Sequence, residues 1–366
     1  MPILKASLDS GISMKIKSYL LVAGAVVTWG LSAAEKVSWI DGTDLPLEGR
    51  GFADIVRRYD RLPKRAEGKV PSEVWNLSHQ SAGMAFRFRT DSRTLRFRWT
   101  VANAELGNYH FSPTGKSGID VYRRTAKGWQ HVKTGCAFAV SNEVSCAWAP
   151  GDEALVYLPN YNVLTGFALG IDGGTEVSSP LPRASGVAKP VVIYGSSITQ
   201  GACASRAGMA FVSIAGRIAD VEIVNLGFSG SGKMEVEVRD FVNEIDASCF
   251  VIDSAWNIDS ATVAQRWEPF ARAVRAAHPD VPIVFMEPCH ESHQRDKGKA
   301  SEVIRACYEK LRHEDPKRWE RLYLLRADEQ LPGDDETTVE GVHPNDWGMM
   351  HVGRALGGLL KRVLWK

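Results

Sequence analysis

Pro190-Val191-Val192-Ile193-Tyr194-Gly195-Ser196-Ser197-Ile198-Thr199-Gln200-Gly201 is the stretch that decides how this chain folds. An apolar segment typical of a buried strand runs directly into a turn of glycine and serine that precedes a helix. Glycine lets the backbone turn sharply and leaves a hydroxyl exposed, and the start of a helix offers unpaired N–H groups to a developing oxyanion. Ser197 is therefore a candidate nucleophile, although serine in such a turn also serves as a helix cap.

The sequence after this stretch alternates between apolar and helix-like segments. We expect further strands, rich in Val, Ile, Leu and Phe, at 221–226, 249–254, 282–287 and 321–325, and helices at 209–218, 262–277, 299–314 and 346–364. Continuous apolar strands that alternate with helices predict an α/β domain with a parallel sheet covered on both faces. In such sheets the ligand binds outside the carboxyl ends of the strands, so function is to be sought there.

The sequence before residue 186 has a different pattern. Segments 83–89 and 94–99 alternate apolar and basic residues, which is typical of strands with one buried and one solvated face. Similar short segments follow at 119–122, 129–132, 154–158 and 163–171, and they predict an antiparallel sandwich of the jelly-roll type. Because Pro180 to Gly186 is typical of a linker, we expect a β-sandwich domain over 35–185 and an α/β domain over 186–366.

Composition and the N-terminus limit the class of protein. The chain is 44% hydrophobic and 24% charged, and its net charge of +1 gives no reason to expect nucleic acid or an anionic membrane as a partner. Basic residues at 14–17, an apolar stretch at 18–31 and small residues at 32–34 predict a signal peptide over 1–34, with 1–13 an over-extended start. We therefore expect a secreted or periplasmic protein. A membrane anchor is the alternative, but the apolar stretch is short for a span.

The six cysteines do not form the framework of a disulfide-rich protein in a chain of 366 residues. Cys136 and Cys146 flank an expected turn and are the best candidates for one disulfide. Cys249 lies in an apolar strand, where a small buried thiol is expected. No cysteine and histidine have the spacing of a structural zinc site, so no metal is expected.

Three further segments at expected strand ends carry polar residues suited to catalysis. The second strand ends in Asn225-Leu226-Gly227-Phe228-Ser229-Gly230-Ser231-Gly232, whose glycine-rich turn exposes amides. Asn257 follows the third strand and has a carboxamide that can donate to an oxyanion. Near the C-terminus, Glu340 precedes His343 by three residues, so its carboxylate can hold one imidazole nitrogen while the other accepts the serine proton.

These blocks resemble those of the SGNH (GDSL-type) hydrolase superfamily, whose order is Gly-Ser-Ser-Ile, then Asn-x-Gly-x-Ser-Gly, then Asn257, then x-x-x-His, and the match spans about 188–364. Ser117-Gly118-Ile119-Asp120-Val121-Tyr122 resembles the Gly-x-Asp-Leu-Tyr signature of a β-rich module that precedes one branch of these esterases. The resemblance implies a flavodoxin-like three-layer domain and an esterase without metal or organic cofactor. It also implies Ser197 as nucleophile, His343 as general base and acid, and the amides of Ser197 and Gly230 with the Asn257 side chain as oxyanion donors.

Two positions depart from the family pattern. Ser196 stands where the family usually has Asp, a residue that is not normally in the triad. Glu340 stands where the family's last block has Asp, and its extra methylene must be accommodated. Asp346, or a backbone carbonyl acting with His343 as a dyad, is therefore an alternative to Glu340 as the group that orients the base.

The sequence predicts a serine esterase that removes short acyl groups, most simply acetyl, from a carbohydrate. Aromatic residues such as Tyr109, Trp256 and Trp347 are candidates for stacking on sugar rings. A lipase or general carboxylesterase is the alternative enzyme. A carbohydrate-binding protein on a degenerate hydrolase fold is the alternative outside the enzymes, motivated by Ser196 and Glu340. Whether the loop from Tyr109 to Gly118 folds over the hydrolase site is left open, as is the oligomeric state.

Overall fold

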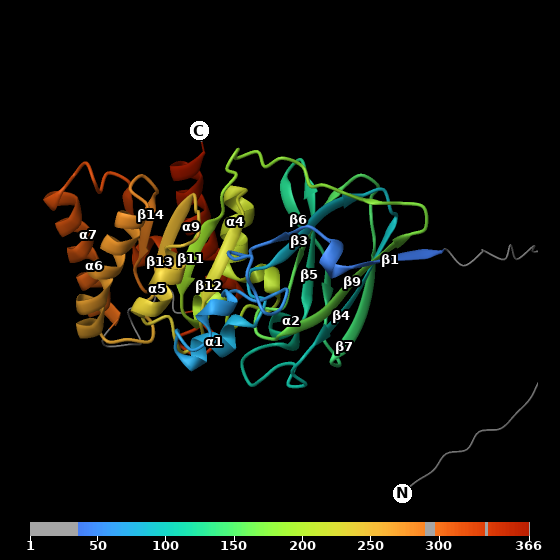
Figure 1. Cartoon of the computed structure of the whole chain (residues 1–366), viewed down its shortest axis with the longest axis horizontal. Helices are drawn as coiled ribbons and strands as arrows, with labels where there is room; N and C mark the ends of the chain where they lie inside the picture. Colours follow the sequence, from blue (N-terminus) through green and yellow to red (C-terminus); the bar gives the residue numbers. More distant parts are fainter. Residues whose placement is uncertain (1–35, 290–296, 334–335, 366) are drawn as a thin grey trace, which may run out of the picture. The chain divides into compact units, whose positions relative to one another are not determined.

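The computed structural model describes residues 36–289, 297–333 and 336–365 (Figure 1). The expected signal peptide at 1–34 lies outside these residues. Among the helices of the described residues, none is both long enough and apolar enough to cross a membrane.

The α/β half is built on a parallel sheet of five strands in the order β12-β11-β13-β14-β15. Their bounds agree with the expected strands to within two residues: β11 Val191–Gly195, β12 Ile223–Gly227, β13 Cys249–Asp253, β14 Ile283–Met286 and β15 Leu322–Leu325. All residues of the first four are buried, which explains their continuous apolar sequence. The strand order reverses at β11, and the crevice at that point of a doubly wound sheet is the usual ligand site.

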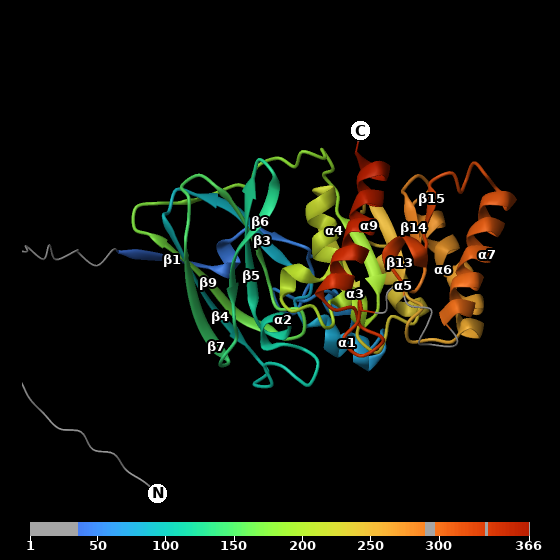
Figure 2. The ribbon, with the colours of Figure 1, turned by 180° about the vertical axis from the view of Figure 1, so that it is seen from behind.

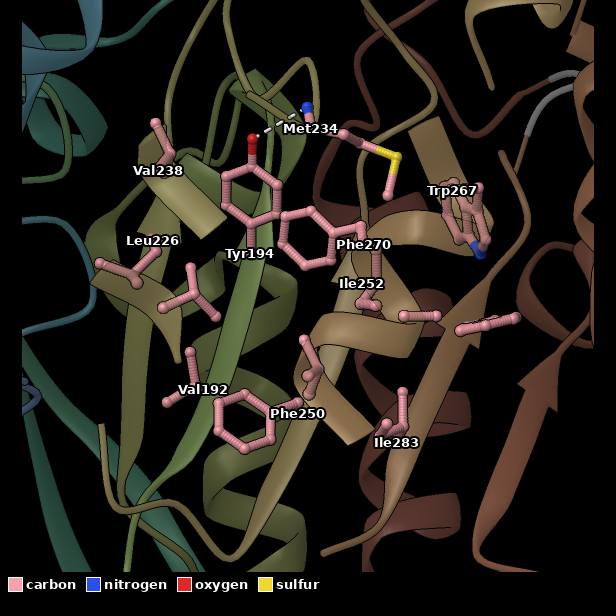
Figure 3. Packing of buried hydrophobic residues seen from close by; sticks show 14 of the residues in the cluster. Val192, Tyr194, Leu226, Met234, Val238, Phe250, Ile252, Trp267, Phe270 and Ile283 are labelled. Carbon is pink, nitrogen blue, oxygen red and sulfur yellow. Dashed lines mark hydrogen bonds between the residues drawn. The ribbon is translucent and has the colours of Figure 1, made fainter. Parts of the chain in front are cut away.

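Helices cover both faces of this sheet. Val191 and Ile193 pack against α4 (Phe211–Ala219) and α9 (Asp346–Leu364), while Val192 and Tyr194 belong to the apolar cluster on the other face. That cluster includes α5 (Val236–Val242), α6 (Ser260–Ala277) and α7 (Lys297–Glu314). Figure 3 shows the ring of Tyr194 against that of Phe270 from α6, with the ring centroids 5.2 Å apart. The three-layer α/β/α architecture expected from the sequence is confirmed.

The N-terminal half is an antiparallel domain of two sheets. One has the order β1-β9-β4-β7 and the other β10-β3-β8-β5-β6, with β2 paired to β3. The strands are β1 Val37–Asp41, β2 Leu47–Glu48, β3 Ala85–Thr90, β4 Thr94–Val101, β5 Ile119–Thr125, β6 Gly128–Gly135, β7 Ser141–Ala147, β8 Glu153–Tyr157, β9 Leu164–Asp172 and β10 Val177–Ser178. In β4 the alternation has the expected meaning, because Phe97 and Trp99 are buried between the sheets while Arg96 and Arg98 pair with outer-face acids.

The segment between β2 and β3 packs on the α/β half. Phe52, Leu62 and Val74 belong to the same apolar cluster as Leu226 and Phe241. Val74 lies on the helix α1 (Ser72–Ser78), which Figures 1 and 2 show beside the α/β half. Part of the chain before residue 185 therefore completes the core of the parallel-sheet domain.

Cys136 and Cys146 are free thiols, so the disulfide expected between them is wrong. Cys136 directly follows β6, and the loop after it is held near the start of β7 because Asn142 Oδ1 accepts the amide of Phe138 at 2.8 Å. Cys146 lies four residues beyond Asn142 in β7, and four residues of strand span about 13 Å, so Cys146 is carried away from the loop that follows Cys136. A disulfide needs Cα atoms within about 7 Å.

Candidate active site

Ser197 is the first residue of α3 (Ser197–Gln200) and lies immediately beyond the carboxyl end of β11. The turn before it requires glycine, because a Cβ on Gly195 would lie 2.1 Å from Thr199 Oγ1 and 2.6 Å from the backbone oxygen of Asp253. As the first residue of a helix, Ser197 has a backbone N–H with no partner within the helix. The nucleophile expected from the sequence is thus held at the switch point of the sheet with its amide available.

His343 lies next to Ser197, although 146 residues separate them in the chain. The distance from Ser197 Oγ to His343 Nε2 is 2.9 Å, and that from His343 Nδ1 to Glu340 Oε1 is 2.5 Å. The backbone amide of His343 also donates to Glu340 Oε1, at 3.0 Å. With a proton on Nδ1, the ring donates to Glu340 and accepts from the Ser197 hydroxyl, which is the geometry of a serine hydrolase relay.

The structure also distinguishes the candidates for orienting His343. Asp346 accepts from the backbone amide of Ser205 at 2.9 Å and from the Ser205 hydroxyl, so its carboxylate is engaged away from the imidazole. Glu340 contacts the ring directly. The longer glutamate side chain is accommodated because it folds back onto the amide of His343, three residues later.

The turn that contains Gly230 lies against the nucleophile turn. The amide of Phe228 donates to the oxygen of Gly195 at 3.0 Å, and a Cβ on Gly232 would lie 2.1 Å from the same oxygen. Gly230 itself has φ +68°, and a Cβ on it would meet no atom within 4 Å, so this residue faces open space. Asn257 Nδ2 donates to the oxygen of Ser231 at 2.7 Å, which ties the end of β13 to this turn. The three expected oxyanion donors therefore come from neighbouring loops on one edge of the sheet.

Residues of the β-domain support the back of this turn. Arg61 is fully buried and donates to the oxygen of Gly227 at 2.5 Å and to that of Gln80 at 2.8 Å. Burial lowers the pKa of Arg61 to about 9. Gln200 Oε1 accepts the amide of Ser229 at 3.0 Å, and its Nε2 donates to Gln80 Oε1 at 2.5 Å. The sequence did not single out Arg61 or Gln80, because nothing in their local pattern relates them to a turn that lies far along the chain.

A loop of the β-domain reaches His343. The rings of His110 and Phe111 lie 5.7 Å and 6.4 Å from that of His343, and Phe111 packs on Tyr161 at 4.7 Å. The Tyr161 hydroxyl in turn donates to the backbone oxygen of Ser197 at 2.9 Å. Burial and the neighbouring His343 lower the pKa of His110. The question left open by the sequence is thus answered, since both domains contribute side chains around Ser197.

The Gly118-to-Tyr122 signature joins the two domains. Asp120 is fully buried and its carboxylate accepts from Arg206 at 2.5 Å and from the amide of Gly208 at 3.0 Å. The Tyr122 hydroxyl accepts from the same guanidinium, and burial raises the pKa of Tyr122 to about 12. The acid and tyrosine of this signature therefore anchor the loop that follows the nucleophile helix.

Two polar residues next to the nucleophile are buried. Asp253, the last residue of β13, accepts from Thr199 Oγ1 at 2.7 Å and from Trp256 Nε1 at 3.3 Å, and burial raises its pKa to about 7. The Ser196 hydroxyl has no hydrogen-bond partner among the described residues. Trp256 is only 8% exposed, so the expectation that it stacks on a sugar ring is wrong, because its indole fills the core beside β13.

Comparison with protein families accounts for both halves of the chain. Residues 188–361 match the GDSL-like lipase/acylhydrolase family, and residues 37–177 match the GxDLY domain, described as the N-terminus of SGNH-hydrolase-type esterases. The chain therefore belongs to the GDSL-like (SGNH) hydrolases that carry this N-terminal domain, and it is an ester hydrolase.

Solved structures share this architecture. A GDSL-like lipase from Bacteroides ovatus has a TM-score of 0.80 and 28% identity, over 90% of this chain and 98% of its own. A salicylyl-acyltransferase from a tetracycline biosynthetic pathway has a TM-score of 0.69 and 17% identity, over 87% and 95%. An acetyl xylan esterase from the rumen bacterium Butyrivibrio proteoclasticus has a TM-score of 0.52 and 9% identity, over 89% and 98%. The last two likenesses show the fold alone. A comparison with curated protein sequences found no match.

Proposed function

We propose that this protein is an exported serine esterase that removes short acyl groups, above all acetyl, from a carbohydrate. The observation that carries the proposal is the continuous set of contacts from Ser197 Oγ through His343 to Glu340, with distances of 2.9 Å and 2.5 Å. Hydrogen-bond contact between nucleophile and base is what a general-base mechanism requires. It also argues against a binding protein on a degenerate fold, in which nothing would maintain this contact.

In the proposed mechanism Ser197 attacks the ester carbonyl while His343 Nε2 takes its proton. The negative charge on the carbonyl oxygen is held by the amides of Ser197 and Gly230 and by Asn257. Glu340 stabilises the imidazolium that forms. His343 then protonates the departing sugar oxygen, leaving an acyl group on Ser197, and water activated by the same histidine releases the acid.

The carbohydrate preference is supported by the surroundings of the site and by structural neighbours. Tyr109, next to His110, is 91% exposed, and Trp347, at the start of α9, is 52% exposed. The ring of Tyr109 packs on that of His110, which lies 5.7 Å from the ring of His343, and exposed aromatic faces suit a flat, polar ring such as a sugar. One structure of the same fold is an acetyl xylan esterase. Export rests on the expected signal peptide and is part of the proposal.

Release of acetate from acetylated xylan and from a simple aryl acetate tests this function, with Ser197→Ala as the inactive variant. Ser196→Ala is the matched control, because it removes a neighbouring hydroxyl that has no partner among the described residues. We expect turnover by the wild type and Ser196→Ala and none by Ser197→Ala. Turnover of the aryl ester alone would reject xylan as substrate, and equal turnover by Ser197→Ala would reject the serine mechanism.

A further inference from the structure

We infer that His110, Cys203 and His343 form a binding site for a divalent transition-metal ion that prefers nitrogen and sulfur ligands, Zn²⁺ in the first place, and that this ion inhibits the enzyme reversibly. The binding site stands on geometry alone, whereas the inhibition rests on the proposed function of His343 as the base.

The three side chains meet from three separate parts of the fold. His110 comes from the β-domain loop before α2 (Pro113–Lys116), Cys203 from the turn after α3, and His343 from the loop before α9. One ligand atom from each lies within 4.8 Å of the other two. In a tetrahedral zinc site with bonds of about 2.0–2.3 Å, ligand atoms are about 3.5 Å apart, so small side-chain rotations bring the three together.

The chemistry of the set favours a borderline-soft ion. Two imidazoles and a thiol are ligands of Zn²⁺, whereas Ca²⁺ and Mg²⁺ require oxygen. A carboxylate is at hand for the fourth position, since Cys203 Sγ is 3.9 Å from Glu340 Oε2. On binding, the thiol proton passes to solvent and the thiolate bonds the ion.

His110 is available for such an ion. Its Nδ1 is buried and has no hydrogen-bond partner among the described residues, so that nitrogen gives up no existing interaction by binding a metal. A buried polar nitrogen without a partner is costly, and a metal bond would remove that cost. This orphaned nitrogen is independent of the catalytic contacts of His343.

Metal binding and catalysis exclude one another at His343. Its Nε2 contacts Ser197 and its Nδ1 contacts Glu340, so an ion on either nitrogen displaces one member of the relay. A bound ion at Nε2 removes the acceptor for the serine proton, and one at Nδ1 removes the link to Glu340. Because the ion is held by both domains, it would also fix the loop that carries His110 against the active site.

Binding is tested first with Co²⁺, whose bond to a thiolate gives a charge-transfer absorption band. The full-length Ser197→Ala protein is used, so that no turnover is needed. We expect one equivalent of Co²⁺ to produce the band and Zn²⁺ to remove it by competition. The band should be lost when Cys203→Ala or Cys203→Ser is added, and kept with Cys146→Ser, which changes a half-buried thiol of the β-domain. No band, or a band that survives both Cys203 variants, would overturn the site.

Inhibition is tested on the aryl acetate with increasing Zn²⁺, each variant being compared with its own rate in the presence of a chelator. We expect Zn²⁺ to inhibit the wild type and EDTA to restore it. In His110→Ala and Cys203→Ser the half-inhibitory Zn²⁺ concentration should rise at least about tenfold, because even supporting groups change metal affinity by that factor. An unchanged concentration in both variants would overturn the inhibition. A cobalt band without any esterase turnover would support the site and contradict the proposed function.

Discussion

Replacement of Glu340 by glutamine separates the charge of this residue from its hydrogen bond. The carboxamide oxygen of Gln can still accept from His343 Nδ1, as Glu340 Oε1 does now at 2.5 Å. What is lost is the negative charge next to the imidazolium that forms when His343 takes the Ser197 proton. Glu340→Gln should therefore lower kcat while the fold and substrate binding stay largely unchanged.

The expected size follows from the separation and exposure of the two groups. Two unit charges about 4 Å apart attract by about 4 kcal/mol at an effective dielectric constant of 20 and by about 1 kcal/mol in water. The side chain of Glu340 is 35% exposed and that of His343 18%, so water screens part of this attraction. A loss of about 2 kcal/mol lowers kcat about 30-fold. Glu340→Ala also removes a charged hydrogen bond of about 1.5 kcal/mol, for a total loss of a few hundredfold.

The assay is kcat on a saturating aryl acetate, with Asp346→Asn as the matched control. Asp346 is an acid in the same loop whose carboxylate binds Ser205, so we expect its variant to stay within about threefold of the wild type. The assignment of Glu340 would be refuted if Glu340→Gln kept kcat within threefold. A larger loss in Asp346→Asn than in Glu340→Gln would transfer the role to Asp346.

Three further predictions concern the oxyanion donor, the domain junction and the buried acid. Asn257→Ala should lower kcat on the aryl ester about a hundredfold with little change in KM, and a loss confined to KM would contradict its role. Asp120→Asn should lower the melting temperature by about 5 °C, because it leaves the largely buried Arg206 cation unpaired, and an unchanged value would show that the pair adds nothing. Burial raises the pKa of Asp253 to about 7, above its value of about 3.9 in the unfolded chain, so the folded protein favours the protonated carboxyl. This contribution to the free energy of unfolding is fully present below about pH 4 and is lost as the pH rises through about 7. In Asp253→Asn the melting temperature should therefore fall less than in the wild type between pH 5 and pH 8, and parallel curves would refute this.

The parallel sheet and its candidate catalytic residues follow from local sequence. Strands buried on both faces must be continuously apolar, so β11 to β14 stand out, and the residues after them fall at one edge of the sheet by geometry alone. Ser197 and Asn257 were placed in this way, and His343 was placed from its position three residues after Glu340, in the loop before the last helix. Glu340 was predicted as the acid from its position three residues before His343, but Asp346 is equally close in sequence, and only the folded loop separates their roles.

Features that depend on contacts between the two domains cannot be predicted from local sequence patterns. His110 and Cys203 are separated by 93 positions in the sequence but lie close together in the structure. They meet because the loop before α2 is bound to the turn after α3, where the Ser112 hydroxyl donates to the backbone oxygen of Ser205 at 2.8 Å. The strand β7 was missed for another reason. It lies at the edge of its sheet, and its sequence from Ser141 to Ala147 is mostly polar. The prediction of a disulfide between Cys136 and Cys146 was wrong because the number of residues between two cysteines does not tell in which direction the strand after the turn runs.

The segment that carries Phe52, Leu62 and Val74 belongs to the β-domain by its position in the chain and to the hydrolase by its packing. A chimera that keeps only the residues after the linker near residue 186 would lack this segment. One apolar face of its parallel-sheet domain would then be exposed to water. During synthesis this segment leaves the ribosome before the strands of the parallel sheet, so it can pack against that domain only after those strands have been made. Engineers who exchange modules between such esterases should therefore transfer this segment together with the hydrolase rather than with the sandwich that precedes it.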